Sequence, residues 1–222
     1  MKTALIFPGQ GSQYVGMGQD FYSSFDSSRA TYDQLDQIMG KKLTNLIFSG
    51  DESELAMTQN SQPSIMATSI AIFSALKEKG KLDESSFHCV AGHSLGEYSA
   101  LVVNKSLDFK DSVELLKIRS KAMQKSMPAG TGGMVAVIGS SEEEITSIKE
   151  SIVSEGKIFI ANDNSIGQVV ISGEMKALDY IVSNSKKLGL KKAIKLPVSA
   201  PFHCELINNA SKVMQGEIDK FN

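Results

Sequence analysis

Residues 92–96 read Gly-His-Ser-Leu-Gly, and this pentapeptide narrows the possible folds more than any other part of the chain. It follows a short apolar run at 89–91 and precedes a helical pattern at 97–103. A Gly-x-Ser-x-Gly pattern between a strand and a helix is typical of a nucleophile elbow, which lifts a serine hydroxyl to the end of a sheet. We therefore expect Ser94 to be a nucleophile, and Leu95 to offer its backbone N–H to an oxyanion at a helix N-terminus. A plain strand-to-helix turn with a capping serine is the alternative.

A glycine-rich loop at 8–13 follows the apolar run 3–7, which we interpret as a buried strand. The loop is not a nucleotide-binding loop, because the two common phosphate-binding patterns would need glycine at Tyr14 or lysine at Met17. We expect it to bring backbone and a glutamine amide close to another group, with a plain loop as the alternative.

The composition is that of an ordinary globular protein. The 222 residues are 41% hydrophobic and 22% charged, and the net charge of −2 predicts no strong attraction to nucleic acid or to a membrane surface. No run is long enough for a membrane span, and the apolar run at 1–7 is too short for a signal peptide. Cys89 and Cys204 form no C-x-x-C pair, so we expect no metal site and a reducing cytoplasm. Cys89 lies in an apolar run and is expected to be a buried thiol.

The region after residue 131 changes character. A Ser141-x-x-Glu144 capping box begins one of its helices. The patterns predict strand, helix, strand, strand, helix and strand at 134–138, 141–154, 157–161, 168–172, 174–187 and 193–196. This order is the ferredoxin-like, split βαβ pattern. We therefore predict an α/β fold in which an inserted ferredoxin-like (α+β) subdomain at 132–197 interrupts a hydrolase-like parallel-sheet core made of 1–131 and 198–222.

A serine nucleophile needs a positioned base, and the chain has three histidines. His93 directly precedes Ser94 in the sequence, and neighbouring side chains at the end of a strand point in different directions. His88 lies six residues back along the strand, about 20 Å away at about 3.3 Å per residue. His203 remains as the candidate base, and a surface loop histidine is the alternative.

Arg119 is one of only two arginines, the other being Arg29. On a helix that starts near 111, its neighbours three and four residues away are all apolar: Leu115, Leu116, Ala122 and Met123. A charge on a buried face needs a partner, and a guanidinium matches a carboxylate bidentately. That partner is either an Asp or Glu of the chain or a substrate carboxylate.

Four features occur in this order: Pro-Gly-Gln-Gly-Ser-Gln at 8–13, Gly-His-Ser-Leu-Gly at 92–96, Arg119, and Ala-Pro-Phe-His at 200–203. Together they resemble the malonyl-CoA:acyl carrier protein transacylase family of bacterial fatty acid synthesis, over the whole chain. Members of that family normally continue well past residue 222, and the further part holds the last sheet elements and the group that orients the base histidine.

The resemblance implies roles for the catalytic residues. Ser94 is acylated by malonyl-CoA and deacylated by the phosphopantetheine thiol of the acyl carrier protein. His203 takes the serine proton and returns one to the leaving thiolate. The backbone N–H groups of Gln10 and Leu95 form the oxyanion hole.

The resemblance also implies substrate contacts. Arg119 holds the malonyl carboxylate, and Phe202 resembles the malonyl-selecting variant of related acyltransferases, since a bulky ring there crowds an α-methyl branch. One methyl group is worth only about 1–3 kcal/mol, so this selectivity is partial. Malonyl-CoA is a substrate, and no cofactor is implied.

Two other functions remain open from the residues alone. An α/β-hydrolase esterase or thioesterase has the order Ser, acid, His, and the acid could be Asp108, Asp111 or Asp163. It needs neither Arg119 nor an inserted subdomain. The third possibility is a non-enzymatic module that binds a carrier protein, which the presence of both Ser94 and His203 disfavours.

Overall fold

The computed structural model describes residues 2–83, 85, 87–128, 130–198 and 200–221. The chain forms two compact units. One consists of the described residues up to Ser120 and from Glu217 on, and the other of Lys121–Gly216. No helix in the described part of the chain is both long enough and apolar enough to cross a membrane.

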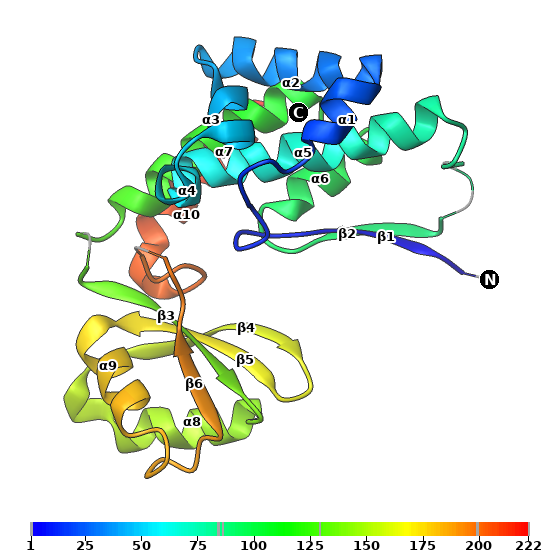
Figure 1. Ribbon diagram of the computed structural model, residues 1–222. Coiled ribbons are helices and arrows are strands. Elements are labelled where there is room, and N and C mark those ends of the chain that lie inside the picture. The colour runs from blue at the N-terminus through cyan, green and yellow to red at the C-terminus, as the bar shows by residue number, and fades with distance from the viewer. Residues whose placement is uncertain (1, 84, 86, 129, 199, 222) are drawn as a thin grey trace. The chain divides into compact units, whose positions relative to one another are not determined.

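The first unit contains a parallel pair of strands, β1 (Ala4–Phe7) and β2 (Cys89–Gly92). Figure 1 shows them side by side, with α5 and α6 on one side of the pair. The helices of this unit are α1 (Gln19–Ser24), α2 (Asp26–Met39), α3 (Leu43–Ser49), α4 (Glu52–Ala56), α5 (Thr58–Glu78), α6 (Gly96–Val103) and the greater part of α7 (Phe109–Lys125).

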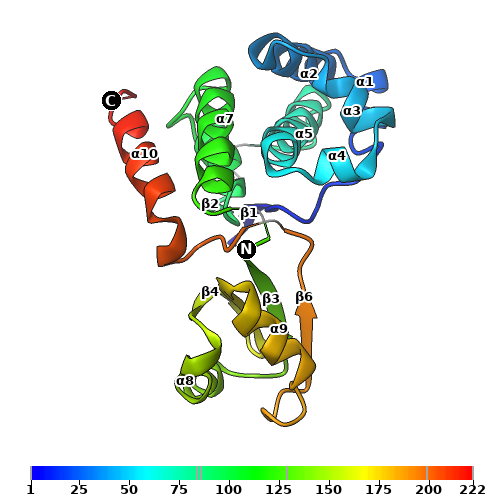
Figure 2. The ribbon, with the colours of Figure 1, turned by 90° about the vertical axis from the view of Figure 1, so that its left-hand side faces the viewer.

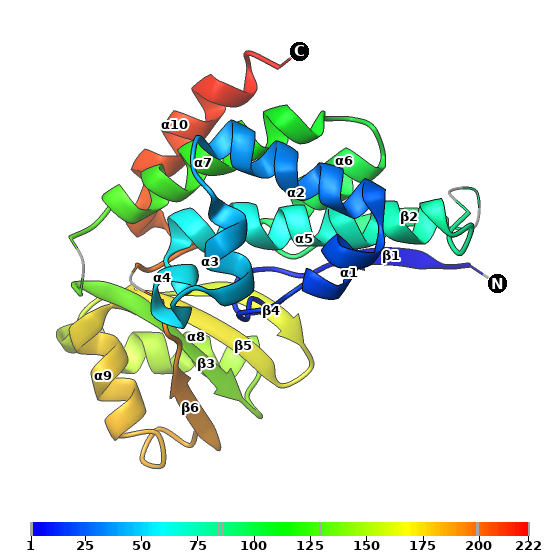
Figure 3. The same ribbon diagram turned by 45° about the horizontal axis from the view of Figure 1, so that its top comes forward.

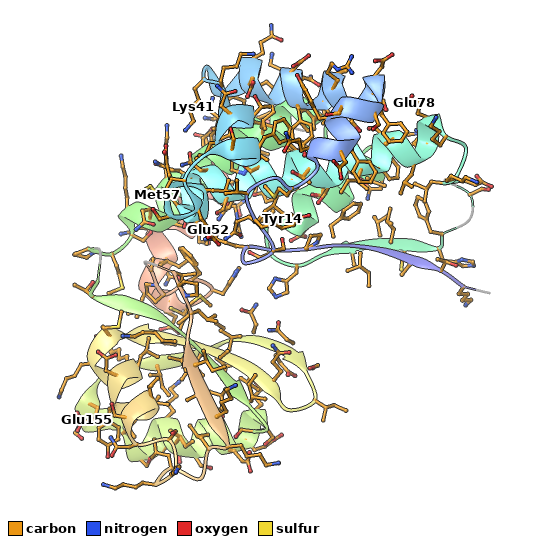
Figure 4. All side chains as sticks on the ribbon, viewed as in Figure 1. Tyr14, Lys41, Glu52, Met57, Glu78 and Glu155 are labelled. Carbon is orange, nitrogen blue, oxygen red and sulfur yellow. The ribbon has the colours of Figure 1, made fainter. Side chains whose placement is uncertain are left out.

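Helix α5 runs through the middle of this unit and is largely buried, as its apolar residues on more than one face predict. The helix starts at Thr58, so Pro63 lies inside it. Figure 3 shows α2 lying along α5. At the C-terminal end of α5, marked by Glu78 in Figure 4, the Glu78 carboxylate accepts hydrogen bonds from the backbone N–H and the hydroxyl of Ser27. These bonds fasten the end of α5 to the start of α2.

The expectation that Cys89 is buried is wrong, because its side chain is exposed. Partner residues of a parallel pair point to the same face, and Ala4, Ile6, Cys89 and Ala91 all face away from the core, with Ile6 72% exposed. Leu5, Phe7 and Val90 point to the other face and pack into the core. A continuous apolar run suggests burial on both faces. The described residues cover only one face.

The second unit contains a four-stranded antiparallel sheet in the order β4-β5-β3-β6. Its elements are β3 (Gly132–Ile138), α8 (Glu142–Ser151), β4 (Ile158–Ser165), β5 (Gln168–Glu174), α9 (Met175–Ser183) and β6 (Lys192–Lys195). The predicted succession of strand, helix, strand, strand, helix and strand is present. The predicted capping box is also present, since Ser141 and Glu144 each accept a hydrogen bond from the other's backbone N–H.

The two faces of this sheet bury different side chains. Val135 and Val137 of β3 pack against α8 and α9, which Figure 2 shows on the same side of the sheet. The alternate residues Met134 and Ala136 point to the opposite face, as the period of two in a strand requires.

That opposite face forms a second cluster with residues outside the four-stranded part. Its other buried members are Val170 of β5 and, outside the sheet, Met123, Ala200, Phe202, Ile207 and Ala210. They bring in the end of α7 and the segment that leads into α10 (Asn208–Ile218) through a short 3-10 turn at Glu205–Ile207. The compact unit therefore extends beyond 132–197 on both sides. The boundaries predicted at 131/132 and 197/198 for the insertion itself stay a prediction.

Candidate active site

Ser94 lies on the tight turn between β2 and α6, in the strand–turn–helix context that the sequence pattern predicts. Its φ is 54°, in the left-handed region that residues with a side chain rarely occupy. The turn is closed by hydrogen bonds from the N–H of Gly96 to the carbonyl of His93 and from the N–H of Glu97 to that of Ser94. Strain of this kind persists only where the surroundings fix the backbone, and it concentrates at functional sites.

The glycines of the pentapeptide permit this turn. A Cβ on Gly92 would lie 1.9 Å from the carbonyl carbon of Gly96, and a Cβ on Gly96 would lie 2.5 Å from the carbonyl oxygen of Phe7. Both contacts are with backbone, which cannot swing aside as a flexible side chain could. The start of α6 therefore lies directly against the ends of β1 and β2.

Arg119 of α7 reaches this turn. Its Nη2 donates to Ser94 Oγ at 3.0 Å, and its Nη1 donates to Gln62 Oε1 at 2.9 Å. The ring of Tyr98 lies beside the guanidinium, with the ring centroid 5.9 Å from Cζ. Three parts of the chain that are distant in sequence, at residues 62, 94–98 and 119, thus meet at one guanidinium.

Partial burial shapes the electrostatics of this group. Burial lowers the pKa of Arg119, and the nearby Tyr98 and Glu97 oppose that shift. Burial also raises the pKa of Tyr98, which the charge on Arg119 partly offsets. Among the described residues, no Asp or Glu forms an ion pair with Arg119. An Asp or Glu partner for Arg119, one of the two alternatives from the sequence, is therefore absent from the described part of the chain.

Gln10 and Leu95 lie on the two segments that meet at the turn. Gln10 follows β1 in the glycine-rich loop, and its side-chain amide donates to Thr58 Oγ1 at 3.3 Å, at the start of α5. The backbone of Leu95 forms the N-cap of α6, and its side chain is fully buried in the core. The N–H of His93 donates to the carbonyl of Phe7, which links the loop's strand to the elbow.

His203 and Phe202 belong to the second unit. His203 also has a positive φ, 58°. Phe202 is 4% exposed and belongs to the buried cluster on the face of the sheet opposite to α8 and α9. Its carbonyl accepts a hydrogen bond from the Ser172 hydroxyl. The pairing of His203 with Ser94 stays a prediction.

Two residues at the site escaped the sequence analysis. Tyr98 lies four residues after Ser94, and on a helix this spacing brings two side chains to one face, so a signal existed. Gln62 lies 57 residues before Arg119 in the chain and carries no local pattern that points to the site. Within the described residues, no group of three or more His, Cys, Asp or Glu side chains could hold a metal ion.

Comparisons with known proteins identify the family of the chain. Residues 4–222 match the model of the acyl transferase domain family. The chain therefore belongs to the acyl transferase domain family. The resemblance that the four sequence features carry is to a narrower family, and two named relatives confirm it.

Two relatives of this chain carry the same name. The proteins named malonyl CoA-acyl carrier protein transacylase from Bacillus subtilis and Haemophilus influenzae are both 41% identical to the chain, over 98% and 95% of its length. The chain spans 68% and 67% of these two proteins.

Solved structures share the mixed α/β fold. An acyl-carrier-protein-S-malonyltransferase from Bartonella henselae matches with a TM-score of 0.95 at 41% identity, over all of this chain and 71% of that one. A chain in the structure of a type II polyketide synthase acyl carrier protein in complex with its malonyl-transacylase matches with a TM-score of 0.92 at 37% identity, over 99% of this chain and 70% of that one.

Substituting Gly92 tests the tightness of the elbow. We expect Gly92→Ala to lower the free energy of unfolding by about 3 kcal/mol or more, because the new methyl group collides with backbone that cannot move without opening the turn. Gly216→Ala is the matched control, since nothing lies within 4 Å of its added Cβ and it sits inside α10. That change should raise stability by about 0.5–1 kcal/mol. Urea unfolding of both variants measures the difference, and equal stabilities would contradict the close approach at Gly92.

Proposed function

We propose that this chain transfers a malonyl group from malonyl-CoA to the phosphopantetheine thiol of an acyl carrier protein through a malonyl-Ser94 intermediate, and so supplies fatty acid chain elongation. The single observation that carries the proposal is a partly buried guanidinium, Arg119, that donates to the elbow serine and forms no ion pair with a carboxylate among the described residues. The names of the relatives support the same reaction.

The first half-reaction acylates the serine. Ser94 Oγ attacks the thioester carbonyl of malonyl-CoA while His203 accepts the hydroxyl proton. The backbone N–H groups of Gln10 and Leu95 hold the oxyanion that forms. The C–S bond then breaks, and the coenzyme A thiolate leaves with the proton from His203.

The second half-reaction reverses these steps with a different thiol. The phosphopantetheine thiol of the carrier protein attacks the carbonyl of malonyl-Ser94 and gives its proton to His203. The oxyanion returns to the same two N–H groups. The C–O bond breaks, and Ser94 Oγ takes the proton back from His203, so that the enzyme is regenerated without a cofactor.

Arg119 selects the acyl group. A guanidinium has five N–H donors, and the structure engages one with Gln62 and one with Ser94. Enough donors remain for a bidentate bond to the malonyl carboxylate, which is among the stronger hydrogen-bonded contacts in proteins. An acetyl group offers no carboxylate and leaves the charge unsatisfied.

Phe202 completes the proposed selectivity by crowding an α-methyl branch. Its burial and the hydrogen bond from Ser172 to its carbonyl support a fixed ring position. A fixed ring discriminates better against one extra methyl group than a mobile one, although the gain is only about 1–3 kcal/mol.

The proposal includes the finer description of the fold. A hydrolase-like parallel-sheet core, 1–131 with 198–222, carries the elbow, and a ferredoxin-like subdomain, 132–197, is inserted in it. The parallel β1–β2 pair at the elbow and the sheet order of the second unit support this description. The two free cysteines support a cytoplasmic location.

Acylation by malonyl-CoA tests the proposed catalytic pair. We expect the intact mass of the protein to rise by one malonyl group, with the adduct on Ser94. Ser94→Ala should abolish the adduct, and His203→Ala should slow acylation by roughly 10⁴, because the two residues act as a unit. His88→Ala is the control and should change little. An adduct on Cys89 or Cys204 would contradict the assignment, hydrolysis without an adduct would indicate an esterase, and no reaction would indicate a binding module.

Substituting Arg119 tests the role of its charge. We expect Arg119→Ala to lower kcat/KM for malonyl-CoA by about two to three orders of magnitude, since an unpaired carboxylate in this site costs about 3–5 kcal/mol. Transfer from acetyl-CoA should persist or rise. Arg119→Lys should recover only part of the loss, because an ammonium lacks the planar fork. The proposed role is wrong if kcat/KM falls by the same factor for both substrates.

A further inference from the structure

We propose that Gln62 is a positioning residue that determines the selectivity of this site, because it aims the Arg119 guanidinium without neutralising it. Gln62 lies on α5 and is 1% exposed, and its Oε1 accepts from Arg119 Nη1 at 2.9 Å. This inference rests on the proposed function, in which Arg119 binds the malonyl carboxylate.

The groups in direct contact with the Arg119 guanidinium are all neutral, although Glu97 lies near enough to oppose the lowering of its pKa. A buried arginine normally pairs with a carboxylate, which orients the guanidinium and cancels its charge at the same time. Here the contacts of Arg119 are an amide oxygen, a serine hydroxyl and the face of an aromatic ring. Each of these groups fixes the guanidinium in space, and none of them carries a negative charge. The positive charge is therefore still available to an incoming anion.

The placement of Gln62 is the second step. It lies within a run of buried residues near the start of α5, between Ser61 and Pro63, so its backbone is held in the core of the unit. Because Gln62 Oε1 is an acceptor in a fixed position, its bond with Nη1 limits the rotation of the planar guanidinium. The ring of Tyr98, which lies on α6, limits the orientation of the same plane. Together they determine the direction in which the remaining N–H donors point.

The hydrogen bond to Ser94 is the third step. Because Nη2 donates to Ser94 Oγ, the guanidinium already lies at the atom that becomes acylated. A malonyl group on that oxygen places its carboxylate only a few bonds away. A guanidinium held by Gln62 at this distance meets the carboxylate without a large rearrangement, and preorganisation of this kind saves ordering cost on binding.

Two substitutions of Gln62 distinguish the orientation of the Arg119 guanidinium from its charge. Gln62→Glu keeps the shape of the side chain and its oxygen next to Nη1, but it adds the carboxylate that the site lacks. The new carboxylate forms a charge-assisted pair with Arg119 and competes with the substrate carboxylate. Gln62→Met removes the hydrogen-bond acceptor, so the guanidinium keeps its charge and is no longer held in one orientation.

The experiment measures kcat/KM for malonyl-CoA and for acetyl-CoA on the same preparation of each variant. Their ratio does not depend on the fraction of protein that is folded, so partial misfolding of a variant cannot mimic the result. Gln62→Glu should lower the malonyl-to-acetyl ratio by about 100-fold, mainly through the KM for malonyl-CoA. Gln62→Met should lower it by about tenfold. Gln59→Glu makes the same chemical change at an exposed position three residues earlier on α5 and should leave the ratio within about twofold.

The outcomes distinguish this inference from the proposed function. If Arg119→Ala lowers the malonyl-to-acetyl ratio and Gln62→Glu does not change it, the role of Gln62 is wrong and the proposed function stands. A fall in both activities by the same factor in Gln62→Glu assigns the residue a purely structural role and overturns the inference as well. A ratio that Arg119→Ala does not change overturns the proposed function, and this inference with it.

Discussion

The guanidinium of Arg119 is the group on which the rest of the site depends. It is held against Ser94 and Gln62 at hydrogen-bond distance, and it has no carboxylate partner among the described residues. Holding a charge in a partly buried site without an ion-pair partner is costly, even though the nearby Glu97 offsets part of the cost. Helices α5, α6 and α7 hold the guanidinium there, since each contributes a side chain that touches the guanidinium or carries it.

The elbow supplies the other half of the geometry. The positive φ of Ser94 is maintained because the start of α6 is pressed against the backbone of β1 and β2, with glycines at 92 and 96 where any side chain would collide. The buried side chain of Leu95 anchors the turn in the core immediately after the serine. The serine hydroxyl is thus positioned by backbone packing, and the arginine is positioned by side-chain contacts.

The sequence predicted the features that are encoded locally. The elbow follows from five consecutive residues and their flanks, the capping box from Ser141 and Glu144, and the inward position of Arg119 from its apolar neighbours on one helix. Gln62 could not be predicted, because its contact with Arg119 joins two helices that are distant in sequence. Burial of Cys89 was predicted wrongly for a related reason: whether a strand face is covered depends on what packs against it, which an apolar run does not specify.

The position of the malonyl carboxylate after Ser94 is acylated tests the role of Arg119 most directly. A crystal structure of the protein trapped as the malonyl-Ser94 adduct would locate this carboxylate. We predict both carboxylate oxygens about 2.7–2.9 Å from two nitrogens of Arg119, with Gln62 Oε1 still bound to Nη1. A carboxylate that points to solvent, with Arg119 making no contact to it, would contradict the account.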